Sequence, residues 1–167
     1  VVEDVLTLSR LERKKQRLVL EKVDLHSICD VTAYSGLAEE KGLVLVDNVP
    51  KKFSVVVDPE KFRQIFVNLV GNAIKYTDKG RVVLSAGKVK KGWFFSVSDT
   101  GPGIPKDKIP KLFDKFYQAD SHLTREKGGT GLGLSIVKEL VKLHKGSVSV
   151  ESSLGHGSAF RVEFPKL

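Results

Sequence analysis

Residues 58–77 read DPEKFRQIFVNLVGNAIKYT and carry the strongest structural signal in the chain. Asp58 is a residue type that caps helix N-termini, and Pro59 suits the first helical position because the N–H that it lacks would have no partner there. Apolar residues then recur at helical spacing, at Phe62, Ile65, Phe66, Leu69 and Ala73. This pattern predicts an amphipathic helix whose apolar face packs on a core.

The same helix carries a polar stripe beside its apolar face. Asn68, Asn72 and Lys75 stand at positions i, i+4 and i+7, so their side chains lie along one side of the helix. Asparagine is a mediocre helix former, but its amide oxygen suits a hard cation, and a lysine suits a phosphate. The stripe therefore indicates either a site for a cation and a phosphate or an ordinary solvent-exposed face.

Two strands are expected next, over residues 81–88 and 92–99. Alternation along the second strand places Asp99 on the same face as three apolar residues, and a carboxylate there needs a hydrogen-bond donor. The triplet Asp99-Thr100-Gly101 fits an Asx turn that the backbone satisfies. It also matches the triplet of aspartic proteases. That class needs a second copy or a homodimer, and its triplet leads into another strand rather than the turn and helix expected here over 105–116.

A glycine-rich segment, GGTGLGL at 128–134, opens a helix expected over 132–145. Glycines let backbone N–H groups approach an anion, and a helix N-terminus attracts negative charge, so the segment indicates phosphate binding. Two familiar nucleotide motifs do not fit. A P-loop needs Gly-Lys followed by Ser or Thr, whereas Gly87-Lys88 is followed by Val89, and a dinucleotide-binding loop needs a third glycine where Leu134 stands.

The rest of the chain mixes helices and strands without regular βαβ alternation. A helix is expected over 1–15, packed either on its own domain or on something outside this chain. Another helix is expected from Asp24 to about residue 41, ending at Gly42. The remaining expected elements are strands over 17–23, 43–47, 54–58, 147–152 and 158–164, and a loop over 118–129. This order favours an α/β fold, a two-layer sandwich in which about three helices cover one face of a mixed sheet of about five strands.

Composition narrows the class of protein. The 167 residues, 41% hydrophobic and 29% charged, fit one globular domain, and no apolar run reaches the roughly 20 residues of a membrane span. The single cysteine, Cys29, excludes an internal disulfide and a multi-cysteine zinc site.

The net charge of +8 indicates an anionic partner or a lysine-rich surface. We expect no nucleic-acid partner, because aromatic residues are not interleaved with the basic ones. The absence of methionine indicates a fragment of a longer protein.

In this order and spacing, the motifs resemble the ATP-binding catalytic domain of sensor histidine kinases. That domain belongs to the superfamily of type II topoisomerase ATPases, mismatch-repair ATPases and large heat-shock chaperones. The resemblance runs from about Leu18 to the C-terminus and implies an ATP-binding catalytic domain over 17–167. The motifs are an N box at 68–77, a first glycine box at 99–105, an F box at 113–116, a second glycine box at 129–135 and a weaker glycine box at 155–157.

The resemblance implies a role for each motif residue. Asp99 would accept a hydrogen bond from the exocyclic amine of adenine, and Tyr76 would lie against the base unless it packs in the core. Asn72 would ligate Mg²⁺ with support from Asn68, and Lys75 would meet the phosphates of ATP. The other residues expected to contact the nucleotide are Gly101, Gly103, Ile104, Phe116, Gly129, Thr130, Gly131, Leu132 and Gly133.

Two positions depart from related patterns. Gln118 stands where many family members carry an arginine, which leaves Arg125, in the expected ATP lid over 118–128, as the nearest candidate for a charge on the γ-phosphate. ATP-hydrolysing relatives carry a glutamate, as the base for water, at the position of Asn68. Without that base, the γ-phosphoryl group is expected to be kept for another acceptor.

The family's acceptor is a histidine followed by an acidic residue, on the first helix of a dimerisation hairpin. The residues that follow His26, His122, His144 and His156 are Ser, Leu, Lys and Gly, so none matches. Residues 1–16 resemble the C-terminal end of that hairpin's second helix.

The resemblance therefore implies a protein-histidine kinase of a two-component system that is unable to phosphorylate itself as this chain. Its expected partners are its own dimerisation domain and a response regulator, in a homodimeric parent, with this chain monomeric. The alternative is a nucleotide-binding regulatory module without kinase activity. We expect a cytoplasmic domain. Many members of the family are anchored in the inner membrane, and the resemblance allows the same for the parent of this chain.

Overall fold

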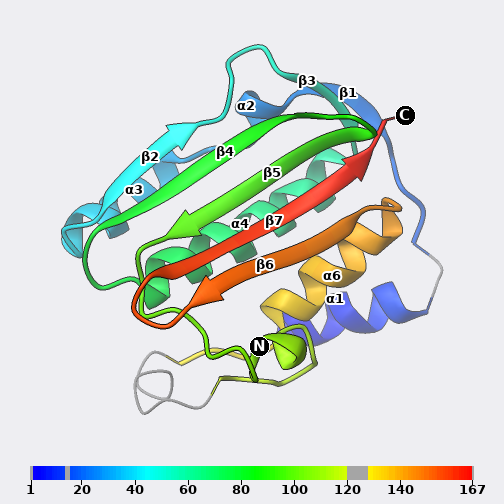
Figure 1. The fold of residues 1–167 in the computed structure, drawn as a ribbon. Coiled ribbons are helices and arrows are strands. Elements are labelled where there is room, and N and C mark those ends of the chain that lie inside the picture. Colours follow the sequence, from blue (N-terminus) through cyan, green and yellow to red (C-terminus); the bar gives the residue numbers. More distant parts are fainter. Residues whose placement is uncertain (1, 14–15, 120–127, 167) are drawn as a thin grey trace.

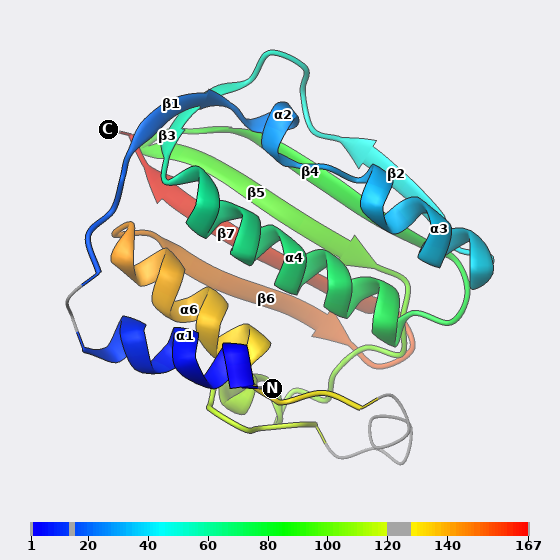
Figure 2. The same ribbon diagram turned by 180° about the vertical axis from the view of Figure 1, so that it is seen from behind.

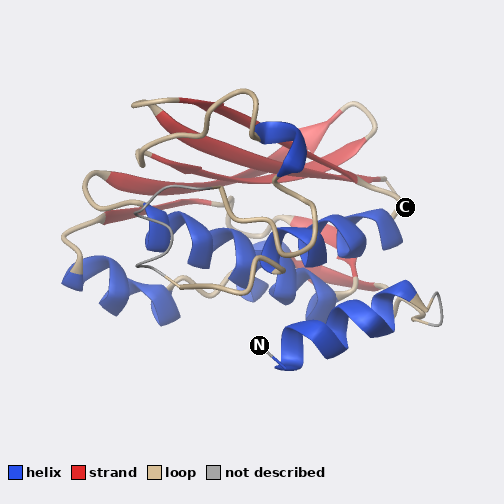
Figure 3. Ribbon diagram, turned by 90° about the horizontal axis from the view of Figure 1, so that it is seen from below, coloured by secondary structure: helices blue, strands red, loops and turns tan. Residues whose placement is uncertain are grey.

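A five-stranded mixed sheet forms one layer of the molecule and helices form the other (Figures 1 and 3). The computed structural model describes residues 2–13, 16–119 and 128–166. The strand order is β2-β4-β5-β7-β6, with β2 parallel to β4 and the other neighbours antiparallel. The strands are β2 (Val44–Asn48), β4 (Arg81–Val89), β5 (Gly92–Asp99), β6 (Ser147–Ser153) and β7 (Gly157–Pro165).

Three helices cover one face of this sheet, as Figure 2 shows from the side opposite to Figure 1. They are α3 (Thr32–Glu40), α4 (Pro59–Tyr76) and α6 (Gly133–Leu143). The two-layer α/β sandwich predicted from the sequence is thereby confirmed. A separate two-stranded sheet, β1 (Glu21–Asp24) with β3 (Ser54–Val57), and a short helix, α2 (Leu25–Ile28), stand beside it. None of the helices among the described residues is both long enough and apolar enough to cross a membrane.

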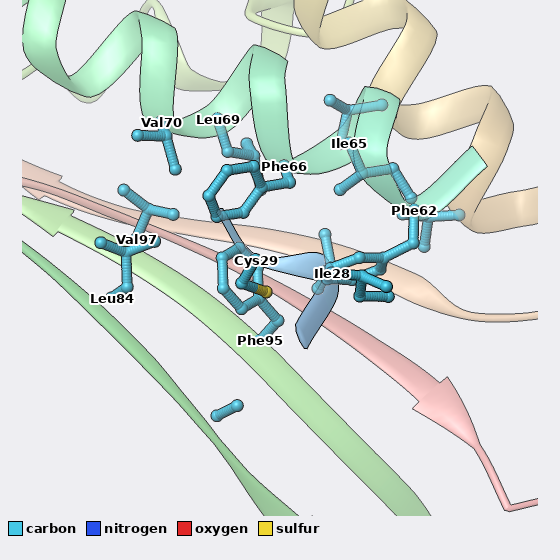
Figure 4. Packing of buried hydrophobic residues seen from close by; sticks show 14 of the residues in the cluster. Ile28, Cys29, Phe62, Ile65, Phe66, Leu69, Val70, Leu84, Phe95 and Val97 are labelled. Carbon is cyan, nitrogen blue, oxygen red and sulfur yellow. The ribbon is translucent and has the colours of Figure 1, made fainter. Parts of the chain in front are cut away.

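Helix α4 forms as its N-terminal sequence predicts. Asp58 caps it, since a side-chain oxygen accepts a hydrogen bond from the Lys61 N–H at 3.2 Å, and Pro59 takes the first helical position. The predicted apolar stripe is buried along the whole helix. Figure 4 shows Phe62, Phe66 and other residues of the stripe facing the sheet.

The core lies between α4 and the central strands. The ring of Phe62 meets the ring of Phe95, on β5, edge to face, with 5.4 Å between the centroids. Cys29 is buried in the same cluster (Figure 4), and burial, with a smaller contribution from nearby carboxylates, raises the pKa of its thiol to about 12. The sulfur is therefore a neutral core atom at physiological pH.

Two predicted helices were wrong in extent. The helix expected over 24–41 is broken into α2 and α3. Between them, Asp30 accepts hydrogen bonds from the N–H and the hydroxyl of Thr32, the first residue of α3. The helix expected over 105–116 is only a single 3-10 turn, η1 (Ile109–Lys111). Pro110 stands inside it without an N–H to donate, so a longer α-helix is disfavoured.

The N-terminal helix α1 (Val2–Glu12) packs against α6 (Figure 2). Leu8 and Leu11 are buried there. The helix therefore lies on its own domain, and the prediction that it also packs on something outside this chain stays a prediction. The strand expected from residue 17 begins only at Glu21.

Candidate nucleotide-binding site

A pocket of about 480 Å³ lies where the C-terminal half of α4, the end of β5 and the start of α6 meet. We call it the α4–α6 pocket. Its volume is within the range of small-molecule sites. The predicted site residues that line it are Asn68, Asn72, Lys75, Tyr76, Asp99, Gly103, Ile104, Gly129, Thr130, Gly131 and Gly133.

Helix α4 turns its polar stripe toward this pocket, so the stripe is not an ordinary solvent-exposed face. The side-chain N–H of Asn68 donates a hydrogen bond to the Gln64 carbonyl at 2.9 Å, which holds this amide along its own helix. No hydrogen bond to a described residue engages the Asn72 amide. Its oxygen is therefore available to a ligand in the pocket.

Lys75 reaches from α4 to the glycine-rich segment. Its Nζ donates a hydrogen bond to the Gly128 carbonyl and lies 5.2 Å from the ring centre of Tyr76. Tyr76 is half-buried and lines the pocket rather than the core, and burial raises the pKa of its phenol. The helix thus presents a cation and a flat aromatic ring side by side.

Strand β5 carries Asp99 to the pocket at its C-terminal end. The Oδ1 atom of Asp99 accepts a hydrogen bond from the Gly101 N–H at 2.9 Å, which is the expected Asx turn. Burial raises the pKa of the Asp99 carboxyl, although hydrogen bonds from the backbone N–H groups of Gly101 and Ser158 act in the opposite direction. The Asx turn and a functional role for the carboxylate are therefore compatible.

The space beside Asp99 has no room for a side chain at Gly101. A Cβ there would lie 2.9 Å from Oδ1 of Asp99 and 3.3 Å from the hydroxyl oxygen of Thr77. The Thr77 hydroxyl is fully buried and has no hydrogen-bond partner among the described residues. Buried polar groups are nearly always paired, so this hydroxyl is an exception beside Asp99, although Thr77 does not line the pocket. Thr77 lies in the N box, but no role was predicted for it.

The glycine-rich segment forms the wall opposite α4. Gly131 has φ +69°, and a Cβ on it would lie 2.8 Å from the backbone of Phe116, so only glycine fits. The hydroxyl of Thr130 accepts a hydrogen bond from the Leu132 N–H at 3.2 Å. Helix α6 begins at Gly133, and its first N–H groups, which have no partner within the helix, lie at this wall. They are suited to an anion.

Among the described residues, three of the predicted site residues do not line the pocket. Gly101 lies behind Asp99, and Leu132 is fully buried in the core. The Phe116 side chain is 66% exposed. Arg125, with residues 120–127 of the expected lid, lies outside the described residues.

Sequence reasoning missed several wall residues. The side-chain N–H of Gln118 donates a hydrogen bond to the Gly129 carbonyl at 2.6 Å, so this position supports the glycine-rich segment. Asp4 of α1 accepts a hydrogen bond from the Thr130 hydroxyl at 3.1 Å. Ser158 lies opposite Asp99 in the β5–β7 register, which the strand patterns alone do not specify. The other unpredicted wall residues are Ala73, Pro102, Pro105, Lys108, Leu112, Tyr117, Ala119, Leu134, Leu154 and Phe160.

The donor set limits which ligands fit. Among the described residues, no group of three or more His, Cys, Asp and Glu side chains could hold a metal ion. A divalent cation in the pocket would therefore take the amide oxygen of Asn72 together with oxygens of its ligand. The pocket combines the half-buried carboxylate of Asp99, which suits an amine, with a lysine and a helix N-terminus, which suit phosphates.

Comparisons with known proteins agree with this chemistry. The family described as "Histidine kinase-, DNA gyrase B-, and HSP90-like ATPase" matches residues 57–167. Two similar proteins are the circadian input-output histidine kinase CikA of Synechococcus elongatus, 37% identical over 99% of this chain, and the sensor histidine kinase TmoS of Ectopseudomonas mendocina, 35% identical over 98%. This chain spans only 23% and 17% of their lengths.

Among solved structures, full-length ShkA in complex with AMPPNP is similar, with a TM-score of 0.87 and 35% identity. The similarity covers 99% of this chain and 35% of that one.

Proposed function

Because this chain belongs to the family of histidine kinase-, DNA gyrase B- and HSP90-like ATPases, we propose that it is the ATP-binding catalytic domain of a sensor histidine kinase. It transfers the γ-phosphoryl group of ATP to a histidine on a dimerisation domain. One observation carries the proposal: three parts of the chain that are far apart in the sequence line one pocket. They are Asn72 and Lys75 on α4, Asp99 on β5, and the glycine-rich residues Gly129, Thr130, Gly131 and Gly133.

Asp99 is the proposed adenine contact. Its carboxylate accepts a hydrogen bond from the exocyclic amine of adenine, while the Gly101 N–H holds the carboxylate in place. Guanine carries a carbonyl oxygen where adenine carries the amine. Two acceptors facing each other repel, so the site selects ATP over GTP. Tyr76 supplies an apolar surface for the base.

The phosphate chain is proposed to lie between Lys75 and the start of α6. The lysine charge and the N–H groups at Gly131 and Gly133 stabilise negative charge there. Asn72 is the proposed ligand of Mg²⁺, since no described residue engages its amide and the pocket offers no carboxylate cluster. When bound, Mg²⁺ neutralises charge on the phosphates that it contacts.

Asn68 explains why the phosphoryl group is kept for transfer. An amide takes no proton from water, and the Asn68 N–H is already engaged with the Gln64 carbonyl. Hydrolysis is therefore slow, and catalysis consists of positioning the γ-phosphoryl group for an incoming imidazole. A bond forms between the imidazole nitrogen and the γ-phosphorus, the bond to the β,γ-bridging oxygen breaks, and ADP leaves.

The acceptor histidine is proposed to lie outside this chain. Both ring nitrogens of His144 are engaged in the core, since Nε2 accepts a hydrogen bond from the Asp58 N–H and Nδ1 donates one to the Leu140 carbonyl. His26 and His156 are not followed by an acidic residue, and His122 is outside the described residues. The proposed partners are accordingly a dimerisation domain of the same homodimeric parent and a response regulator. The proposed location is the cytoplasm, where ATP is supplied.

Phosphotransfer tests the proposal directly. This chain is mixed with γ-labelled ATP, Mg²⁺ and a purified dimerisation hairpin from its own parent. We expect label on the hairpin histidine, in an acid-labile and base-stable bond, and none on this chain alone. The controls are a hairpin with that histidine replaced by glutamine and the Asn72→Ala variant of this chain, both expected to remain unlabelled. Failure of the wild-type pair to label, when ATP binding is measured in the same preparation, would refute the kinase proposal.

A further inference from the structure

A second pocket lies at the other end of β5 from Asp99. It has a volume of about 320 Å³ and surrounds the turn between β4 and β5, close to the C-terminus in Figure 1. We call it the β4–β5 pocket. No residue lines both pockets. The site therefore cannot be an extension of the proposed nucleotide site.

Positive charge is concentrated around this pocket. Lys22 comes from β1, Lys88 and Lys90 from the β4–β5 turn region, and Lys166 from the C-terminal segment, and all four are exposed. The lining contains no aspartate, glutamate or arginine. None of the four lysines forms an ion pair with a described residue. Like charges placed together without compensation repel one another, and an anion in the pocket would relieve that repulsion.

The apolar part of the wall holds an unpaired donor. Trp93 is 5% exposed, and its ring stacks on the Phe164 ring with 4.4 Å between centroids. Its indole N–H is buried and has no acceptor among the described residues. The indole nitrogen can only donate, and an unpaired buried donor is rare in folded proteins. The lysines thus lack a negative charge nearby, and the indole N–H lacks a hydrogen-bond acceptor. An anion would supply both.

We propose that the β4–β5 pocket binds a small phosphate-bearing anion with more than one negative charge. Lysine binds phosphate as a compact point charge, and four lysines with no acidic residue in the lining favour an anion with more than one charge. Its volume is near the lower limit for small-molecule sites, which favours a compact anion such as a diphosphate group. The bound anion connects β1, the β4–β5 turn and the C-terminal segment.

The chain provides its own reporter, since Trp93 is its only tryptophan. Inorganic pyrophosphate is titrated into the ¹⁵N-labelled chain while the single indole N–H resonance is followed. We expect a saturable displacement of this resonance. The Lys75→Gln variant, altered in the α4–α6 pocket, is expected to show the same displacement, because the two sites share no residue.

Matched charge variants separate a defined site from general attraction. Lys88→Gln with Lys90→Gln is expected to weaken pyrophosphate binding about tenfold, as expected for the loss of charge-assisted contacts. Lys138→Gln with Lys142→Gln removes the same charge from exposed positions on α6 and is expected to leave the affinity within about twofold. Trp93→Phe keeps an aromatic ring at this position and removes the N–H donor. We expect calorimetry to show weaker pyrophosphate binding in this variant. An indole resonance that does not move, moves without saturating, or responds equally in both double variants would overturn the proposal.

Discussion

The cap of α4 offers a quantitative test of what positions the site, because this helix carries Asn68, Asn72, Lys75 and Tyr76. Asp58 is 3% exposed, and its carboxylate accepts hydrogen bonds from the Lys61 N–H at 3.2 Å and the Val19 N–H at 2.9 Å. The Lys61 ammonium lies 3.3 Å from the same carboxylate. Asp58→Ala removes all three interactions at once.

The expected loss follows from these contacts. Loss of the helix cap costs about 1 kcal/mol of stability. Loss of the contacts to the Val19 N–H and the Lys61 ammonium costs about 1–3 kcal/mol more, a range that already allows for the burial cost of the carboxylate that is removed. We therefore expect the free energy of unfolding to fall by about 2–4 kcal/mol. For a domain of this size, the melting temperature should fall by about 4–16 °C.

Urea denaturation followed by Trp93 fluorescence measures this change. Asp58→Asn keeps a side-chain oxygen that can cap the helix. Its free energy of unfolding is expected to fall by less than half as much as that of Asp58→Ala. Asp107→Ala, at an exposed position, is the control and should remain within about 0.5 kcal/mol of the wild type. If Asp58→Ala were as stable as Asp107→Ala, the assignment of the cap as a principal support of α4 would be refuted.

Three further predictions concern pH and the pocket. Burial lowers the pKa of His144, so below about pH 6.5 the unfolded chain binds a proton that the folded chain does not, and thermal melts should show stability falling as the pH drops. This slope should shrink in His144→Gln, and an unchanged slope would contradict the assignment. Asp99→Asn should weaken ADP binding about tenfold or more in calorimetry without unfolding the chain, and unchanged affinity would exclude the adenine contact. Gly131→Ala should lower ADP affinity, because its Cβ meets Phe116 at 2.8 Å; affinity equal to the wild type would show that this wall is dispensable.

Local sequence signals were sufficient to predict much of the fold. Asp58 and Pro59 located the start of α4, and alternation along β5 placed Asp99 at the end of a buried face. The polar stripe of α4 predicted that Asn68, Asn72 and Lys75 would share one side of the helix, and they line one pocket. These features depend on residues close in sequence, whose geometry is set by helix and strand periodicity.

Features that depend on contacts distant in sequence could not be predicted. Ser158 reaches the pocket through the β5–β7 register, and Asp4 reaches it because α1 packs on α6. The short 3-10 turn at 109–111, in contrast, has a local cause, because Pro110 has no N–H to donate inside the segment expected to be a helix. The pairing of Gln118 with the Gly129 carbonyl depends on loop geometry that no periodicity encodes.

Nucleotide selectivity tests the central claim most directly, namely that the α4–α6 pocket is an adenine-selective ATP site. Calorimetry of the wild-type chain compares a non-hydrolysable ATP analogue with the matching GTP analogue, each with Mg²⁺. The carboxylate of Asp99 predicts saturable one-to-one binding of the ATP analogue and binding of the GTP analogue that is weaker by about a hundredfold or more. Equal affinity for the two analogues, or no binding of the ATP analogue, would contradict it.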